Sequence, residues 1–146
     1  MIGVIETEGG SAEWTFPAEP GSVRGARNAV RETLRAWDLG LPVIDVTVLL
    51  VSELVTNSLR HATGPIGVRL VRPGATPAEV AEASADGHGL LVEVSDPLPD
   101  LPTRRRAGPD DEGGRGLQLV ACSARRWGTR KGKSGKTVWF ELPLSG

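Results

Sequence analysis

The sequence is poor in cysteine, aromatic residues and net charge. Its 146 residues include one cysteine, two phenylalanines, four tryptophans and no tyrosine. The single thiol, Cys122, cannot form an internal disulfide, so nothing favours an oxidising compartment. Few aromatic side chains leave little for stacking against single-stranded nucleic acid. A formal net charge of −1 gives no general attraction to DNA or to an anionic membrane.

Export signals and long apolar runs are also missing. Residues 1–10 contain two glutamates and no basic segment followed by an apolar run, which is not typical of a signal peptide. The longest apolar stretch, around 46–51, is far shorter than the roughly 20 residues that span a bilayer. With 39% hydrophobic and 24% charged residues, the composition is typical of a soluble globular domain. We therefore expect a cytoplasmic protein.

Hydrophobic periodicity predicts three helices. Helical spacing predicts a first helix with Ser22 as its N-cap. Gly40 and Pro42 end this helix. A second helix is expected over 43–62. A third is expected over 117–124, directly after a glycine cluster.

Alternating apolar residues predict the strands, which we expect at 14–16, 66–71, 90–95, 126–131 and 137–142, the last two forming a hairpin. Together with the helices, this order predicts an α/β (α+β) two-layer sandwich. Its mixed, mainly antiparallel sheet would be covered on one face by about three helices. We expect residues 1–12 to form a flexible tail and residues 13–146 to form a single domain. The long loop at 97–112, rich in Pro, Arg and Asp, is of a length that is usually functional or disordered.

The second expected helix carries the most informative pair of residues. Glu53 and Asn57 lie four residues apart and share a helix face with apolar residues, including Leu49 and Leu50. A buried carboxylate needs a partner, a metal or an open cavity, because burying it unpaired is costly. One interpretation is a glutamate satisfied by neighbouring hydrogen bonds. The other is phosphoryl transfer, in which the Asn oxygen binds Mg²⁺ and the Glu activates the attacking hydroxyl or water.

Two later features fit the second interpretation. Asp96 follows an expected strand and is a suitable acceptor for an exocyclic amine such as that of adenine. Gly113, Gly114 and Gly116 precede the third helix, where backbone N–H groups and the helix dipole favour a phosphate. Each feature alone is also common in ordinary turns.

This ordered set resembles the GHKL (Bergerat) ATPase fold, and within it the anti-sigma-factor serine/threonine kinases. The resemblance covers about residues 14–142 and rests on four segments: Glu53-x3-Asn57-x3-His61-Ala62, Asp96, Gly114-Arg115-Gly116-Leu117 and Gly135-Lys136-Thr137. It implies a histidine-kinase-like ATPase domain that binds ATP and Mg²⁺. It also implies a kinase that phosphorylates a serine of an anti-anti-sigma partner and sequesters a sigma factor, and a homodimer.

The resemblance also implies residue roles. Glu53 would be the general base and Asn57 the Mg²⁺ ligand. Asp96 would bind the adenine amino group with support from Thr137, while the loop at 97–112 would be the ATP lid. The remaining nucleotide-binding positions would be His61, Gly114, Arg115, Gly116 and Leu117.

The sequence departs from the family at Leu98, where the pattern has a glycine two residues after the aspartate. Leucine lacks the backbone freedom of glycine, so we expect this end of the pocket to be shaped differently from the family pattern or to bind ATP more weakly. The alternative function is therefore a catalytically weak or inactive nucleotide-binding module that sequesters a sigma factor or another regulator. A P-loop at 132–137 is disfavoured because Arg130 stands at its first glycine position and a strand follows it.

Overall fold

The computed structural model describes residues 3–7, 10–61, 64–72, 89–97, 112–132 and 135–143. Within these ranges the chain forms six strands and three helices. The strands are β1 (Gly3–Thr7), β2 (Ser11–Phe16), β3 (Ile66–Val71), β4 (Gly89–Asp96), β5 (Arg126–Gly132) and β6 (Gly135–Pro143). The helices are α1 (Gly21–Ala36), α2 (Leu41–His61) and α4 (Glu112–Ser123).

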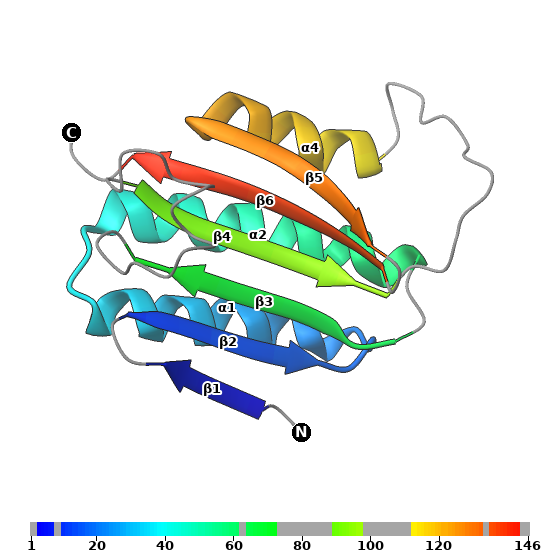
Figure 1. Ribbon diagram of the computed structural model, residues 1–146, viewed down its shortest axis with the longest axis horizontal. Coiled ribbons are helices and arrows are strands. Elements are labelled where there is room, and N and C mark those ends of the chain that lie inside the picture. The colour runs from blue at the N-terminus through cyan, green and yellow to red at the C-terminus, as the bar shows by residue number, and fades with distance from the viewer. Residues whose placement is uncertain are drawn as a thin grey trace.

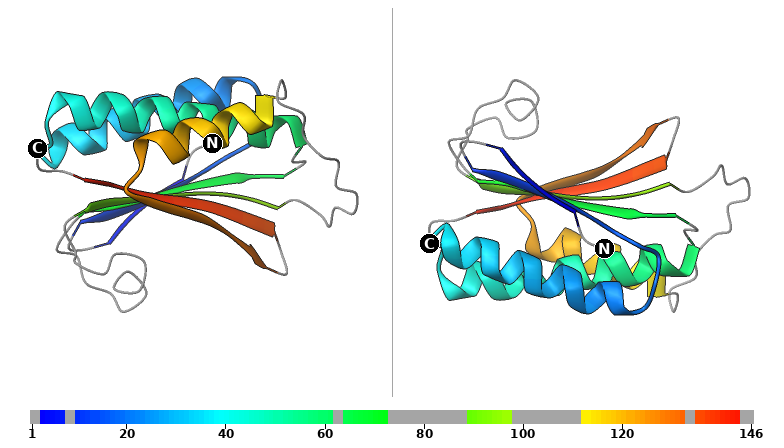
Figure 2. Two further views of the ribbon diagram at one scale, coloured as in Figure 1. Left: turned by 90° about the horizontal axis from the view of Figure 1, so that it is seen from above. Right: turned by 90° about the horizontal axis from the view of Figure 1, so that it is seen from below.

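The strands form one sheet in the order β1-β2-β3-β4-β6-β5, and all five pairings are antiparallel. The three helices lie on the same face of this sheet (Figures 1 and 2). The other face is called the helix-free face below. The expected two-layer α/β sandwich with a mainly antiparallel sheet is confirmed.

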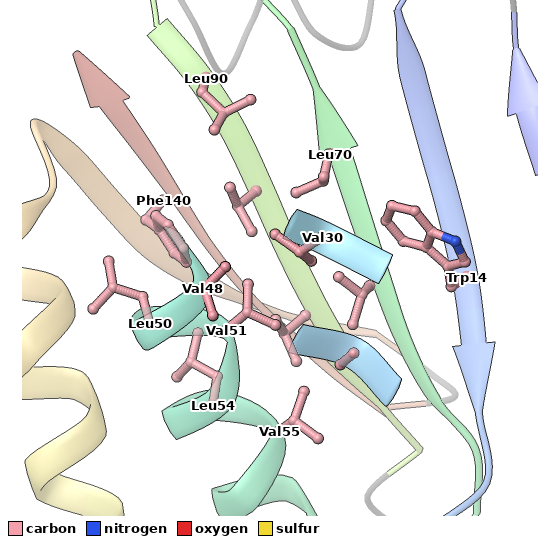
Figure 3. Close-up of a cluster of buried hydrophobic side chains, with 14 of the residues drawn as sticks. Trp14, Val30, Val48, Leu50, Val51, Leu54, Val55, Leu70, Leu90 and Phe140 are labelled. Atoms are coloured by element: carbon pink, nitrogen blue, oxygen red, sulfur yellow. The ribbon is translucent and has the colours of Figure 1, made fainter. Parts of the chain in front are cut away.

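Alternation along the strands builds the core. On β3, Ile66, Val68 and Leu70 are fully buried toward the helices. Helix α2 contributes Leu50, Val51 and Val55, and α1 contributes Val30 and Leu34, all with no exposed surface. Figure 3 shows side chains of α1, α2 and four strands meeting in this cluster. Burying each such side chain stabilises the fold by about 1.5–3 kcal/mol, so the two layers are held together mainly by this contact.

Helix α2 is more apolar than the sequence analysis expected. Leu41–Arg60 has a mean hydropathy of 1.4 and is long enough to cross a membrane by length and composition alone. The helix instead lies beside α1, with its buried face on the sheet (Figure 2). In the described structure it is therefore a core helix of the domain, while a cytoplasmic location stays a prediction.

Two local expectations about the N-terminal part are wrong. Residues 3–7 form β1, which pairs with β2 from Gly3↔Thr15 to Thr7↔Ser11, so this segment is not a tail outside the sheet. Ser22 is not the N-cap of α1, because Pro20 occupies that position without a side-chain cap. The Ser22 hydroxyl instead donates to the Pro17 carbonyl at 2.6 Å and fixes the chain that leads from β2 into the helix.

Candidate functional site

Four segments that are distant in sequence meet at one end of the molecule. They are the C-terminal half of α2, the C-terminal end of β4, the start of α4, and the end of β5 with the start of β6 (Figures 1 and 2). Antiparallel pairing brings the β-segments together, because Asp96 at the end of β4 is directly opposite Lys136 at the start of β6. The predicted site residues lie on or beside these segments.

Glu53 and Asn57 lie at the border of the buried stripe of α2. Both are partly buried, whereas the stripe itself contains Val51, Leu54 and Val55. Leu49, which was expected to share the core-facing side with Glu53, is 47% exposed. The expectation that this pair interrupts the core face is therefore wrong, since the face is rotated away from Glu53. The two side chains still lie on one edge of the helix, one turn apart.

The side-chain oxygen of Asn57 is buried without a hydrogen-bond partner. Asn57 Oδ1 has less than 1 Å² of exposed surface and accepts no hydrogen bond among the described residues. Buried polar atoms are nearly always paired, so an orphaned acceptor needs an explanation such as an ion or ordered water. Leaving it unpaired costs about 1–3 kcal/mol. A carboxamide oxygen is also a hard donor of the kind that Mg²⁺ prefers, so this position fits the predicted metal ligand.

Asp96 is buried and is hydrogen-bonded to a residue of the helix layer. It is 7% exposed, and its Oδ2 accepts a hydrogen bond from Ser58 Oγ at 2.9 Å. Ser58, which is 8% exposed, follows Asn57 directly on α2. Ser58 could not be predicted as a site residue from the sequence, because a contact between residues 38 positions apart leaves no local pattern. One helix thus carries both the orphaned oxygen and the donor that fixes the carboxylate.

A small pocket contains these groups. Its volume is ≈ 50 Å³, and its lining residues come from α2, β4, β5 and β6: Leu54, Asn57, Ser58, Val94, Asp96, Thr129, Lys136 and Val138. Small-molecule sites usually measure about 300–1,000 Å³. The space that the described walls enclose is therefore smaller than a typical small-molecule site. Apolar Leu54, Val94 and Val138 beside one carboxylate suit a flat, partly polar ring.

A larger hollow of ≈ 530 Å³ lies at the same end of the sheet but takes most of its floor from the helix-free face. Thr15, Gly67, Ser95 and Thr137 stand opposite one another on four neighbouring strands and leave a depression because their side chains are small. Neither Asn57 nor Ser58 lines it. Asp96 and Lys136 line both spaces. We place the candidate site in the smaller pocket, because only that pocket is also lined by Asn57, with its unsatisfied oxygen, and by Ser58.

Thr137 does not support Asp96. Its Oγ1 lies 2.7 Å from Ser95 Oγ, and both hydroxyls are on the helix-free face. Lys136, one residue earlier, lines the small pocket instead. The role expected for Thr137 is thus corrected by the alternation of β6, in which Val138 and Phe140 face the helices. The same alternation in the sequence could have identified Lys136.

Gly135 allows β6 to begin against the end of β4. Its φ is +154°, and a Cβ at this position would overlap the carbonyl oxygen of Asp96 and lie 2.8 Å from Pro97 Cα. Only glycine tolerates this combination of conformation and close approach. The glycine before Lys136 therefore sets the position of the pocket wall.

The glycine cluster lies inside α4 rather than before it. The helix begins at Glu112, so the expected start at Leu117 is wrong. The first four N–H groups of a helix lack an acceptor in the helix, and these include the groups of Gly113, Gly114 and Arg115. Gly116 lies one turn further on and does not offer an unpaired N–H. The side chains of His61, Arg115 and Leu117 lie outside the described part of the structure. So do residues 98–111 of the lid expected at 97–112, which include Leu98.

Protein ligands for a metal are sparse in the described ranges. No group of three or more His, Cys, Asp and Glu residues gathers there. Mg²⁺ commonly takes most of its ligands from substrate phosphates and water, so one amide oxygen at the pocket wall is compatible with such an ion. The geometry is suited to a ligand that has an amine at one end and a metal-bound phosphate at the other.

Comparison with known proteins agrees with this geometry. Residues 16–142 match the family described as the histidine kinase-like ATPase domain. The fold is similar to a crystal structure of the RsbU and RsbW domains of Rv1364c from Mycobacterium tuberculosis, with a TM-score of 0.65 and 21% identity. That match covers 93% of this chain, which spans about a third (33%) of the longer protein. None of the curated proteins matches the sequence.

Proposed function

We propose that this chain, which belongs to the histidine kinase-like ATPase domain family, binds ATP with Mg²⁺ and phosphorylates a serine or threonine of a regulatory protein. Membership rests on a family match that includes both the helix with Asn57 and the strand with Asp96. Membership of an ATPase domain family implies ATP binding. The protein substrate and the kinase step are the further parts of the proposal.

The observation that carries the proposal is the buried, unpartnered Oδ1 of Asn57. A structural asparagine at this depth would have its oxygen paired. A bound cation removes the cost, and Mg²⁺ at this position would neutralise charge on the phosphates during transfer. The proposed site therefore explains an atom that the fold alone leaves unsatisfied.

Other residues would bind the base, bind the phosphates and accept the proton. Asp96 accepts a hydrogen bond from the amino group of the base and thereby orients the nucleotide. The first turn of α4 offers backbone N–H groups and the positive end of the helix dipole to the phosphates. Glu53 accepts the proton of the attacking hydroxyl, one helical turn from the metal ligand. His61, Arg115, Gly116 and Leu117 are proposed only as further members of the nucleotide site.

The proposed partners follow from the resemblance and from the similar structure. We propose a serine-containing protein of the anti-anti-sigma type as the substrate and a sigma factor as a second partner. The similar protein contains RsbU and RsbW domains in one chain, which is compatible with a place in such a regulatory system. A homodimer and a cytoplasmic location belong to the same proposal.

A second candidate is a nucleotide-binding module that sequesters a regulator without useful catalysis. It is favoured by the position of Glu53, which does not line the small pocket in the described part of the chain. Leu98 in place of the family glycine points the same way. Under this alternative Asn57 and Asp96 keep their roles, and only the proton acceptor is without function.

The test is calorimetric titration with ATP in the presence and absence of Mg²⁺. We expect Asn57→Ala to lose the Mg²⁺-dependent part of the affinity, while Thr56→Ala, an exposed neighbour on α2, binds like wild type. Absence of nucleotide binding by the wild type at millimolar ATP would contradict the proposal.

Phosphotransfer is tested separately with purified partner protein and radiolabelled ATP. We expect Glu53→Gln to bind ATP normally and to lose phosphotransfer. A wild type that binds ATP but transfers no phosphate would favour the non-catalytic alternative.

A further inference from the structure

We infer that Ser58 is a positioning residue that sets the orientation of the Asp96 carboxylate, and with it the ability of the site to distinguish an amino group from a carbonyl on the bound base. This inference rests on the proposed nucleotide-binding function. It assigns a specific role to a residue that the sequence analysis did not select.

The first support is the geometry of the contact. Ser58 Oγ donates to Asp96 Oδ2 at 2.9 Å, and both residues are more than 90% buried. Hydrogen bonds to an ionised carboxylate are stronger than bonds between neutral groups. The rotation of an aspartate carboxylate about χ2 has a broad energy minimum. A fixed donor on one oxygen therefore determines which directions the carboxylate presents to the pocket.

The second support is a comparison with the other hydroxyl residues of α2. Thr47 donates to the Val43 carbonyl at 2.7 Å, Ser52 to Leu49 at 3.1 Å and Thr56 to Ser52 at 2.7 Å. Such bonds to the preceding turn are the usual outcome for Ser and Thr in a helix. Ser58 instead donates across the layer to β4. Its hydroxyl is thus directed at the site rather than back to its own helix.

The third support is the place of Ser58 in the sequence. It directly follows Asn57, so the backbone of one helix holds both the proposed metal ligand and the donor to Asp96. Both residues line the same pocket. A carboxylate fixed relative to Asn57 holds the base at a constant distance from the metal-binding end. Ser58 therefore links the two ends of the ligand through α2.

The experiment compares ATP with inosine triphosphate, which carries a carbonyl in place of the adenine amino group. Dissociation constants for both nucleotides are measured by calorimetry with wild type, Ser58→Ala, Ser58→Thr, Ser58→Cys and the control Thr56→Ala. We expect Ser58→Ala to weaken ATP binding about fivefold, because a typical hydrogen bond contributes about 1 kcal/mol. Binding of inosine triphosphate should change by less than about twofold, since the carbonyl that replaces the amino group offers no proton to Asp96. Ser58→Thr, which keeps the hydroxyl, should restore the preference for ATP.

A combined variant separates positioning from general packing. In an Asp96→Asn background, Ser58→Ala should no longer change the ratio of the two affinities, because contacting residues are expected to couple. Ser58→Cys keeps the size of the side chain with a weaker donor and takes the place of the alanine variant if the latter does not fold. An equal loss for both nucleotides, or an unchanged ratio, would overturn the inference while leaving nucleotide binding intact. A wild type that binds neither nucleotide would overturn the proposed function as well.

Discussion

Two neighbouring residues of β4, Ser95 and Asp96, face opposite sides of the sheet and have different surroundings. On the helix-free face, Ser95 and Thr137 place their hydroxyls 2.7 Å apart, so that one donates a hydrogen bond to the other. On the helix side, Asp96 accepts from Ser58 in a pocket that also holds the unpartnered Asn57 oxygen. The first contact joins two groups of the sheet, whereas the second arrangement leaves a buried acceptor, Asn57 Oδ1, available to a ligand.

This difference shows that the helix layer makes the site. At the end of β4, the strand places the Ser95 hydroxyl on one face and the Asp96 carboxylate on the other. Only the face covered by α2 adds an unsatisfied acceptor, Asn57 Oδ1. A hollow of larger volume on the helix-free face does not contain such a group among its described lining residues. The buried polar atom without a hydrogen-bond partner, rather than the volume of the cavity, therefore identifies the candidate site. Four substitutions test this comparison.

The largest effect is expected for Gly135→Ala, which disturbs both faces together. The new Cβ would meet the Asp96 carbonyl and is strained by the positive φ. We expect the free energy of unfolding to fall by about 3 kcal/mol, as strain and overpacking each cost about 1–3 kcal/mol. Chemical denaturation measures this change. Gly132→Ala, at the other end of the same turn, has its nearest contact at 3.9 Å and should change stability far less. Equal losses for the two variants would show that the close approach at Gly135 is unimportant.

The next largest effect is expected for Asp96→Asn, which changes only the helix side. The amide loses the charge that strengthens bonds from Ser58 and from an amine. Because a hydrogen bond to a charged group contributes about 1.5–3 kcal/mol, ATP affinity should fall by about 10- to 100-fold. Calorimetric titration checks this value, and circular dichroism checks the fold. Unchanged affinity would remove Asp96 from the nucleotide site.

A smaller effect is expected for Lys136→Met, at the border of the two faces. Lys136 lines the small pocket, and its positive charge attracts a triphosphate. Since partly exposed charges interact by about 1 kcal/mol or less, ATP affinity should fall by roughly three- to fivefold at low salt and less at high salt. Lys131→Met is the matched control, because Lys131 lines only the larger hollow. A larger loss of ATP affinity for Lys131→Met than for Lys136→Met would indicate that the phosphates bind in the larger hollow.

The smallest effect is expected for Thr137→Val on the helix-free face. This variant removes the partner of Ser95 and should cost about 1 kcal/mol of stability. ATP affinity should stay within about twofold of wild type, because no atom of the small pocket changes. The two quantities are measured by denaturation and calorimetry on the same preparation. A strong loss of ATP affinity would restore Thr137 as a nucleotide-binding residue.

Much of the fold could be predicted from periodicity because burial follows it closely. The strand expected at 66–71 coincides with β3, and no end of the C-terminal hairpin differs from its expected position by more than two residues. The start of α4 could not be predicted, because glycine in a helix costs only about 1 kcal/mol per residue and packing overrides it. The packing of α4 beside α2 is visible only in three dimensions. β1 was missed because its pairing with β2 is not visible in residues 3–7 alone.

The candidate site was partly predictable for a related reason. The spacing of Glu53 and Asn57 on one helix and the position of Asp96 after a strand are local patterns that the sequence contains. Which edge of α2 is buried, and the donation from Ser58 to Asp96, depend on how the layers pack. Lys136 was accessible from the alternation of Val138 and Phe140, but the family pattern drew attention to Thr137 instead.

The order of strands in the sheet also determines when the site can form. β6 follows β4 and β5 in the sequence, yet it lies between them in the sheet. During synthesis, α2 and β4 emerge from the ribosome well before the strand that completes the wall of their pocket. Until β6 pairs with β4, Asp96 lacks Lys136 opposite it and the apolar side chains of α2 lack Phe140 above them. The pocket therefore cannot form before β6 has paired with β4, although α2 and β4 precede β6 in the sequence.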